Sequence, residues 1–208
     1  MIEQLINAGR EIVHAGIAQG WGGNLSCRCQ GKILITRSGA DLGRLTEADF
    51  VHINPRASHL ETRLPKPSSE LGLHLGAYEA RPQILTVMHV HSPQAIAAGL
   101  LGRSLPALTP DVYRHLGASI PLLPYIAPTT ENLKTAVTLA LQATSAILLQ
   151  NHGVVVVAQS VSQALLRLTL LEEQAGIYLA ALAAGNLRVL SEEDMRVLDE
   201  AGGVFYNL

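Results

Sequence analysis

The chain is poor in cysteine and in aromatic side chains, it has almost no net charge, and it lacks long apolar runs. Aromatic residues make up 4% of its 208 residues, and the formal net charge is −2. A nucleic-acid-binding surface normally needs clustered Lys and Arg with stacking rings, so nucleic acid is not an expected partner. No apolar run approaches the ~20 residues that span a bilayer, and the first residues lack the basic and apolar segments of a secretory signal. We therefore expect a cytoplasmic protein that binds neither nucleic acid nor membrane.

The two cysteines, Cys27 and Cys29, lie too close together to staple a fold. On a strand over residues 25–29 they alternate with polar neighbours, so both are expected to point inward as small apolar side chains. A Cys-x-Cys metal pair is the alternative, but a zinc site of that kind needs further cysteines or histidines nearby.

The composition is sufficient for one domain with a sizeable core, because 48% of the residues are hydrophobic in a chain of 22.2 kDa. Periodicity and breakers predict helices over residues 2–19, 70–80, 93–101, 130–143, 161–184 and 191–200, with one helical turn at 46–49. Strands are predicted over 25–29, 32–36, 51–54, 84–91, 120–123, 145–150 and 153–158. Because the strands are clustered between helices, we expect a single α/β domain over residues 1–208, with a central, mainly antiparallel or mixed β-sheet flanked by helices.

Two histidines, His89 and His91, lie at the end of the apolar strand predicted over residues 84–91. Residues i and i+2 of a strand share a face, so the two imidazoles project side by side. His152 is the third candidate, in the turn between the last two predicted strands, where Gly153 allows unusual backbone angles. Three imidazoles with an open position are typical of a catalytic rather than a structural metal site. A lone histidine in such a turn is more often an ordinary polar loop residue, so the prediction depends on all three together.

Glu70 is the candidate base, in the first turn of the helix that Pro67-Ser68-Ser69 introduces. A carboxylate there also has a purely structural interpretation, since it compensates the helix dipole. Hydroxyls and free backbone N–H groups at a helix start form an anion site, however, so Ser68 and Ser69 beside Glu70 favour a phosphorylated substrate. The polar turns at residues 20–26 and 36–39 add only weak evidence for phosphate binding. The remaining histidines have no partner at ligand spacing and are interpreted as ordinary: His14, His52, His59, His74 and His115.

Five motifs occur in the order seen in the class II aldolase/adducin family, which the chain resembles over about residues 5–185. They are Gly23-Asn24-Leu25-Ser26, Ile35-Thr36-Arg37-Ser38-Gly39, Pro67-Ser68-Ser69-Glu70, His89-Val90-His91 and Leu149-Gln150-Asn151-His152-Gly153. The resemblance implies a zinc-dependent carbon–carbon lyase of the fuculose-phosphate aldolase type. Such an enzyme cleaves a keto-sugar phosphate by a retro-aldol reaction through a metal-stabilised enediolate.

The resemblance also assigns roles by position. It implies Zn²⁺ or another divalent transition metal on His89, His91 and His152, with Glu70 as the acid/base that also contacts the metal when no substrate is present. Phosphate would be held by a set of small polar residues: Asn24, Ser38, Gly39, Ser68 and Ser69. Tyr113 and Tyr206 are the candidates for the proton at the departing aldehyde, although neither aligns closely with a family tyrosine. A homotetramer with sites at the subunit interfaces is implied as well.

Three alternatives stay open at this stage. Asp41-Leu42-Gly43-Arg44-Leu45 and Lys66-Pro67-Ser68 resemble the 3-oxo-tetronate 4-phosphate decarboxylase branch of the family, which usually has Lys where Ser69 stands. An adducin-like module would share the fold without catalysis, but it would be expected to lack the histidines and the glutamate. A cupin also uses His-x-His with Glu, yet it places the Glu a few residues later, and Ser92–Gly102 contains none.

Overall fold

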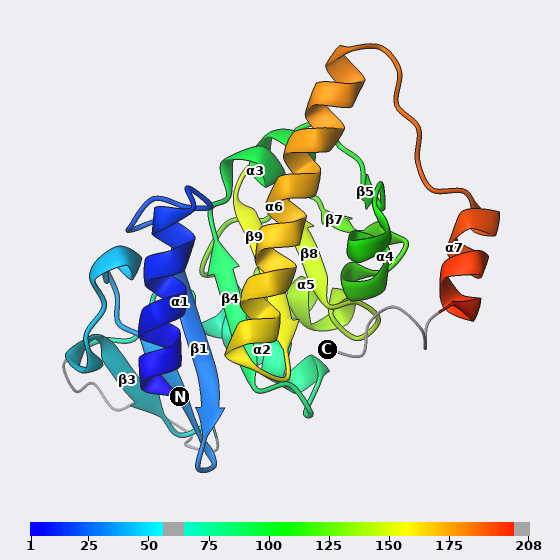
Figure 1. Ribbon diagram of the computed structural model, residues 1–208. Coiled ribbons are helices and arrows are strands. Elements are labelled where there is room, and N and C mark those ends of the chain that lie inside the picture. The colour runs from blue at the N-terminus through cyan, green and yellow to red at the C-terminus, as the bar shows by residue number, and fades with distance from the viewer. Residues whose placement is uncertain (56–64, 202–208) are drawn as a thin grey trace.

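The computed structural model describes residues 1–55 and 65–201, and in it the chain folds around a seven-stranded mixed sheet (Figure 1). The strand order is β3-β2-β1-β4-β9-β8-β7, and every neighbouring pair is antiparallel except β7 with β8. The bounds of the strands are β1 Gly23–Cys29, β2 Lys32–Thr36, β3 Phe50–Ile53, β4 Thr86–Val90, β7 Leu122–Leu123, β8 Ala146–Leu149 and β9 Gly153–Ala158. A separate two-stranded sheet pairs β5 Leu105–Pro106 with β6 Ser119–Ile120.

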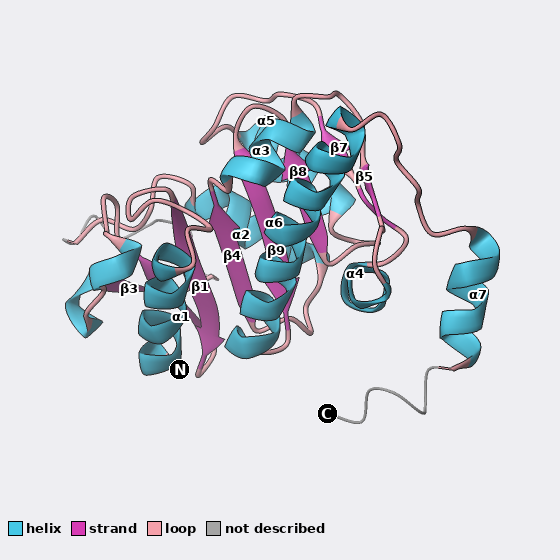
Figure 2. Cartoon of the chain, turned by 45° about the horizontal axis from the view of Figure 1, so that its top comes forward, coloured by secondary structure: helices cyan, strands magenta, loops and turns pink. Residues whose placement is uncertain are grey.

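Helices cover both faces of the large sheet, which confirms the predicted α/β class (Figure 2). Alternate residues of the central strands enter two different cores: Met88 and Val90 pack under the helices of one face, and Val87 under those of the other. The first face carries α1 Ile2–His14, α3 Pro93–Gly99, α4 Pro110–Leu116 and α6 Val161–Ala183. The second face carries α2 Leu71–Ala80 and α5 Glu131–Ala140. The last helix, α7 Glu192–Glu200, lies beside α4 and away from the sheet (Figure 1).

Several helix starts follow from capping chemistry that is readable in the sequence. Thr130 caps α5 by accepting a hydrogen bond from the Leu133 N–H at 3.2 Å, and Ser160 caps α6 through the Gln163 N–H at 3.1 Å. The helical turn predicted at 46–49 is present as a short 3₁₀ helix over Glu47–Asp49 with a capping box. A second 3₁₀ turn covers Leu42–Arg44.

Three predictions about secondary structure were wrong. The first helix ends at His14 rather than near residue 19, because Gly16 adopts a left-handed φ of 71° directly after the cap. The segment before residue 117 contains a helix, α4, that was not predicted; Thr109 caps it and Pro110 occupies its first turn. The strand expected over 120–123 is two short strands in different sheets, with Pro121, which has no N–H to donate, between them.

The cysteines lie on β1 as expected, but only Cys27 is fully buried, whereas Cys29 at the strand end is partly buried. The carboxylate and imidazole cluster described below does not include them, and they form no disulfide. Within residues 1–55 and 65–201, none of the helices has the length and apolarity that a bilayer crossing requires.

Candidate metal centre

The pleat of β4 directs His89 toward the α2 side of the sheet, because its neighbours Met88 and Val90 belong to the opposite core. In the sheet His89 pairs with Asn24 on β1 and with Val155 on β9, so β4 is flanked by a strand on each side at this residue. His91 follows immediately after the strand, where its N–H donates to the Gly22 carbonyl at 2.8 Å. The two imidazoles therefore start from adjacent, fixed positions of the same backbone.

His152 lies in the tight turn between β8 and β9. Asn151 supplies the left-handed residue of this turn, with a φ of 58°, and the His152 N–H donates to the Leu149 carbonyl at 3.1 Å. The expectation that Gly153 adopts an unusual backbone angle was wrong, since its φ is not positive. Glycine is required there for space instead: a Cβ would lie 2.4 Å from the Val90 carbonyl oxygen and 3.2 Å from Cδ2 of His91. The absence of a side chain lets this turn approach the end of β4.

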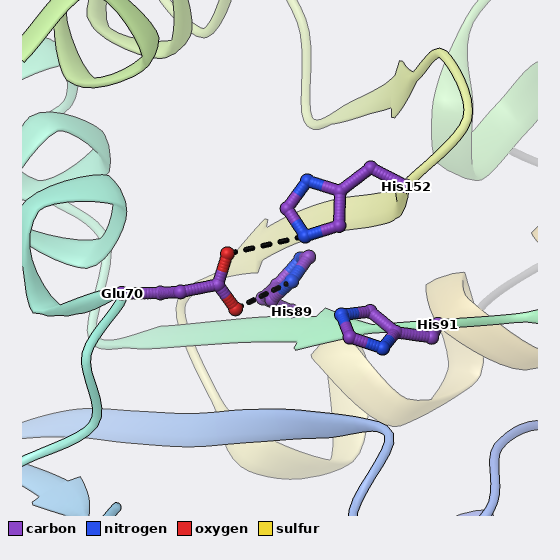
Figure 3. Close-up of side chains that lie close together, drawn as sticks. All are labelled: Glu70, His89, His91 and His152. Atoms are coloured by element: carbon purple, nitrogen blue, oxygen red, sulfur yellow. Dashed lines mark ion pairs between the residues drawn. The ribbon is translucent and has the colours of Figure 1, made fainter. Parts of the chain in front are cut away.

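Glu70 occupies the N-cap position of α2, at the start of the helix that packs on this face. Its carboxylate points between two of the imidazoles (Figure 3). Oε2 lies 3.0 Å from Nε2 of His89, and Oε1 lies 3.1 Å from Nε2 of His152. The structure thus brings together four residues from three separate parts of the sequence.

The three rings surround a small common space. Their centroids are 4.8 Å apart for His89 and His152, and 5.1 Å apart for each of the two pairs that include His91. One potential ligand atom from each ring and one carboxylate oxygen of Glu70 all lie within 4.8 Å of one another. This is the arrangement in which one cation can contact several donors at once.

The hydrogen bonds around His89 indicate that a cation fits this space. Its Nδ1 lies 2.9 Å from the Val154 carbonyl oxygen, which can only accept, so Nδ1 carries the proton. The Nε2 of a neutral ring is then a bare lone pair facing a carboxylate oxygen, and two lone pairs at hydrogen-bond distance need a proton or a metal ion between them. Further buried atoms in the cluster have no hydrogen-bond partner within the described residues: Nε2 of His91, Nδ1 of His152 and Oε1 of Glu70. Imidazole nitrogens with a carboxylate oxygen are a donor set that Zn²⁺ and related divalent ions prefer.

Electrostatics act on two members of the cluster, His91 and Glu70. Burial, reinforced by the nearby His89 and His152 and opposed by Glu70, lowers the pKa of His91 to about 4, so this ring is neutral at neutral pH. For Glu70, burial opposes ionisation, but the contacts with His152 and His89 outweigh it and hold the pKa of the carboxyl well below its ordinary value. A neutral imidazole at His91 and an ionised carboxylate at Glu70 are the forms of these two side chains that bind a metal.

Four of the five residues predicted to bind phosphate lie on two segments that run side by side next to Glu70. The Ser38 N–H donates to the Lys66 carbonyl at 2.9 Å, and the Ser68 N–H donates to the Thr36 carbonyl at 3.0 Å. This pairing places Ser38 and Gly39 close to Ser68 and Ser69, just before the N-terminus of α2. Ser38, Gly39 and Ser69 are exposed, whereas Ser68 is buried and its Oγ accepts from the Glu70 N–H at 3.2 Å.

The fifth residue, Asn24, lies apart from these two segments. It is buried on β1, where Nδ2 donates to Oε2 of Glu70 at 3.1 Å and Oδ1 contacts the His74 ring. A role for Asn24 in phosphate binding stays a prediction, and its contacts here are with the carboxylate itself.

The two candidate tyrosines are not part of the cluster. Tyr113 lies on α4, and its hydroxyl donates to Oδ2 of Asp199 on α7 at 2.8 Å, a contact that raises the pKa of the phenol. Tyr206 lies outside the described residues. The proposed role of each in proton transfer stays a prediction.

His74 was interpreted as an ordinary histidine, yet the structure places it directly behind the cluster. It is fully buried and contacts Asn24 and Ser26. Two signals in the sequence could have identified it: His74 follows Glu70 by four residues and so shares its helix face, and Ser26 shares a strand face with Asn24.

Comparison with known proteins identifies relatives along nearly the whole chain. The sequence pattern of the class II aldolase and adducin N-terminal domain matches residues 3–179. Over 201 residues the chain is 36% identical to the L-fuculose phosphate aldolase of Escherichia coli K12, covering 96% of this chain and 93% of that protein. It is 32% identical over 198 residues to a 5-methylthioribulose-1-phosphate/5-deoxyribulose-1-phosphate aldolase of Rhodospirillum rubrum, covering 94% and 88% of the two chains.

Solved structures agree with the sequence comparison. An L-fuculose 1-phosphate aldolase superposes with a TM-score of 0.87 at 30% identity, covering 96% of this chain and 94% of the other. An Escherichia coli structure whose name gives aldolase, epimerase and decarboxylase as alternatives has a TM-score of 0.85 at 28% identity, covering 94% and 96%.

Proposed function

The chain belongs to the class II aldolase and adducin family, and from that premise we propose that it is a zinc-dependent aldolase that cleaves a phosphorylated keto-sugar. Its named relatives are aldolases, which are metal-dependent lyases. The substrate class is suggested by relatives that act on L-fuculose phosphate and on 5-deoxyribulose-type 1-phosphates. These two substrates differ beyond the phosphate-bearing end, so the particular sugar is left open in this proposal.

The observation that carries the proposal is the cluster of three buried or half-buried imidazoles around the Glu70 carboxylate. Several potential ligand atoms of this cluster have no hydrogen-bond partner among the residues that the structure describes. His89, His91 and His152 would hold the metal. A divalent ion bound there supplies Lewis acidity, which polarises the carbonyl of the substrate and stabilises negative charge on its oxygen. An adducin-like binding module would not need this combination of residues. Buried polar atoms without hydrogen-bond partners destabilise the fold, so their presence argues for a bound metal.

Glu70 is proposed to move the proton at carbon. In the synthetic direction, the ionised carboxylate removes a proton from the carbon next to the carbonyl. In the cleavage direction Glu70 takes up a proton equivalent to the one that the departing hydroxyl loses, and delivers it to that carbon after the C–C bond breaks and the electron pair stays on it. The hydroxyl of the departing carbon loses its proton as it becomes an aldehyde, and Tyr113 or Tyr206 is proposed to handle this proton.

The phosphate is proposed to bind where residues 36–39 and 66–69 run together. Exposed hydroxyls of Ser38 and Ser69 face solvent there, and the N-terminus of the ten-residue helix α2 follows at once. An anion at this place is favoured by the dipole of the helix. Because Glu70 is the N-cap of that helix, a phosphate bound here holds the reacting carbon within reach of the carboxylate.

The test is a substrate panel assayed on the purified, zinc-loaded protein. L-Fuculose 1-phosphate, 5-methylthioribulose 1-phosphate and 5-deoxyribulose 1-phosphate are supplied separately. Cleavage between the third and fourth carbons of any ketose 1-phosphate releases dihydroxyacetone phosphate, which a coupled reductase assay detects. We expect release of this product from at least one of them, and its loss after chelation. A zinc-loaded protein that cleaves none of the three would contradict the proposal.

A decarboxylase is the second candidate, favoured by the similarity to the structure named as aldolase, epimerase or decarboxylase and by the Asp41–Leu45 and Lys66–Ser68 segments. It would use the same stabilisation of negative charge beside a carbonyl, with CO₂ leaving in place of an aldehyde. Adding 3-oxo-tetronate 4-phosphate to the panel and measuring CO₂ separates the two reactions.

We further propose that the whole 208-residue chain forms one domain and assembles as a homotetramer with sites at the subunit interfaces. The assembly is supported by the position of Tyr113, which within its own chain contacts Asp199 rather than the cluster. Light scattering is expected to give about four times the 22.2 kDa chain mass. A monomeric active species would contradict this part of the proposal.

A further inference from the structure

A row of buried polar side chains runs from the Glu70 carboxylate into the interface between β1 and α2. Asn24 donates to Glu70 at 3.1 Å and contacts the His74 ring on its other side. The Ser26 hydroxyl lies 2.7 Å from Nδ1 of His74 and 2.9 Å from the Tyr78 hydroxyl. All four are almost completely inaccessible, with Asn24 the most exposed at 6%. Polar groups at this depth are costly unless every one is paired, so the pairing constrains the proton positions.

Glu70 fixes the direction of the first two hydrogen bonds. The Nδ2 group of Asn24 donates to Oε2 of Glu70, so its carbonyl oxygen is the atom that contacts His74. Since that carbonyl oxygen only accepts, Nε2 of His74 must carry a proton. The orientation of the Asn24 amide and the tautomer of His74 therefore determine each other.

The remaining bonds follow from the neutrality of the ring. Burial, reinforced by His89 and opposed by Glu70, lowers the pKa of His74 to about 3, so the ring is uncharged at neutral pH and Nδ1 is a lone pair. The Ser26 hydroxyl must then donate to Nδ1, which leaves its oxygen to accept from Tyr78. Every donor in the row points toward Glu70.

We propose that His74 is a positioning residue for the reaction: through its Nε2–H it locks the Asn24 amide in the orientation that holds the Glu70 carboxylate. The inference rests on the proposed function, in which Glu70 transfers the proton at carbon. Without the His74 donor, the Asn24 amide is held only by its bond to Glu70 and is free to tilt. The position of the Nδ2–H group that holds Oε2 of Glu70 is then no longer fixed.

The proposal also explains why this row is not built from apolar side chains. The Glu70 carboxylate has close contacts with three side chains among the described residues: the amide of Asn24 and the imidazoles of His89 and His152. Of these, the Asn24 amide is the one that is not a proposed metal ligand. When those imidazoles hold a metal ion, the Asn24 bond still fixes Oε2. The carboxylate thus keeps its place relative to the substrate carbon independently of its contact with the metal.

The kinetic test compares His74→Leu, which removes both ring nitrogens at similar volume, with His74→Gln, which restores an N–H donor for Asn24 and an acceptor for Ser26. Removing a group that orients a metal-site residue typically lowers metal affinity or activity about 10–100-fold. We expect kcat of His74→Leu to fall by that factor while KM changes less than about twofold and zinc stoichiometry stays at the wild-type value. His74→Gln should recover most of the lost kcat. Equal kcat for wild type and a folded His74→Leu would overturn the proposal, as would a folded His74→Gln no better than His74→Leu.

A second measurement does not depend on turnover or on a large substitution. Nitrogen-15 NMR of the zinc-loaded, histidine-labelled protein reports the tautomer of each ring, with the His74 signals assigned from their absence in His74→Gln. We expect protonated Nε2 and bare Nδ1 at pH 7, and the opposite tautomer or a charged ring would overturn the proposal. Ser26→Ala removes only one hydroxyl and is expected to lower kcat in the same direction. If the wild type itself cleaves no substrate, the proposed function fails, whereas an active wild type with an indifferent His74 refutes this inference alone.

Discussion

The substitution Gly153→Ala tests whether the close approach of the β8–β9 turn to the end of β4 builds the metal centre. An added Cβ would lie 2.4 Å from the Val90 carbonyl oxygen, about 1 Å inside ordinary contact, and 3.2 Å from Cδ2 of His91. The first neighbour is backbone in a central strand and cannot rotate away. Forcing extra volume into such a place costs about 1–3 kcal/mol. For a chain of this size that lowers the melting temperature by roughly 2–4 °C per kcal/mol.

To relieve this overlap, the β8–β9 turn would have to move away from the end of β4, which would displace His91 and the turn residue His152. We therefore expect Gly153→Ala to weaken zinc binding about 10-fold or more, as perturbed support of a metal ligand commonly does. Melting temperature is measured by scanning calorimetry with and without zinc, and affinity by competition with a chromophoric chelator.

Gly72→Ala is the matched control, because the nearest atom to its added Cβ is 4.0 Å away, on Lys134. It lies inside helix α2, where Ala is favoured over Gly by about 1 kcal/mol, so this variant should be as stable as wild type or more stable. A Gly153→Ala protein that matches the wild type in both melting temperature and zinc affinity would refute the packing argument.

Three further predictions follow from the site. Glu70→Gln should keep its zinc but lose about 10²–10⁴-fold in turnover, the usual contribution of a general acid–base; near-normal turnover would remove Glu70 from the mechanism. Removing zinc should abolish turnover and lower the melting temperature. At a free zinc concentration 100 times the dissociation constant, the stabilisation lost is about 2.7 kcal/mol, and an unchanged melting temperature would argue against a bound ion. Acid stability should depend on His74, because burial holds its folded pKa at about 3, against about 6.5 in an unfolded chain. Between these two pKa values the unfolded state binds one proton more than the folded state. The free energy of unfolding therefore decreases as the pH falls, by about 1.4 kcal/mol per pH unit well inside this range. The free energy of unfolding is measured with urea on the zinc-free protein at pH 6, 5 and 4. It should fall less steeply with decreasing pH for His74→Gln than for wild type, and an equal pH dependence of the two proteins would contradict the assignment.

Much of the fold was predictable, because capping residues and hydrophobic alternation act locally. Thr130 and Ser160 mark the starts of α5 and α6 in the sequence as clearly as in the structure. The order of the sheet was not predictable, since it depends on which apolar strands pair across long stretches of chain. The β1–β4 pairing, which sets Asn24 opposite His89, joins segments about 65 residues apart by position number.

The metal cluster was predictable as a set of candidates, because His89 and His91 share a strand face by periodicity alone. Their convergence with His152 and Glu70 is a property of the folded sheet and of helix α2. His74 was missed because ligand spacing was the criterion, and a residue that acts through Asn24 needs no such spacing. Gly153 was interpreted through backbone angles, whereas its role is the space it leaves beside Val90 and His91.

The most direct test of the central claim is the metal content of the purified chain and of His91→Ala, with His52→Ala as the control. His52 is an exposed histidine on β3 that takes no part in the cluster. After dialysis against zinc-free buffer, elemental analysis should find about one zinc per chain in the wild type and in His52→Ala, and almost none in His91→Ala. An active wild type free of bound metal, or a His91→Ala protein with a full equivalent of zinc, would contradict the account.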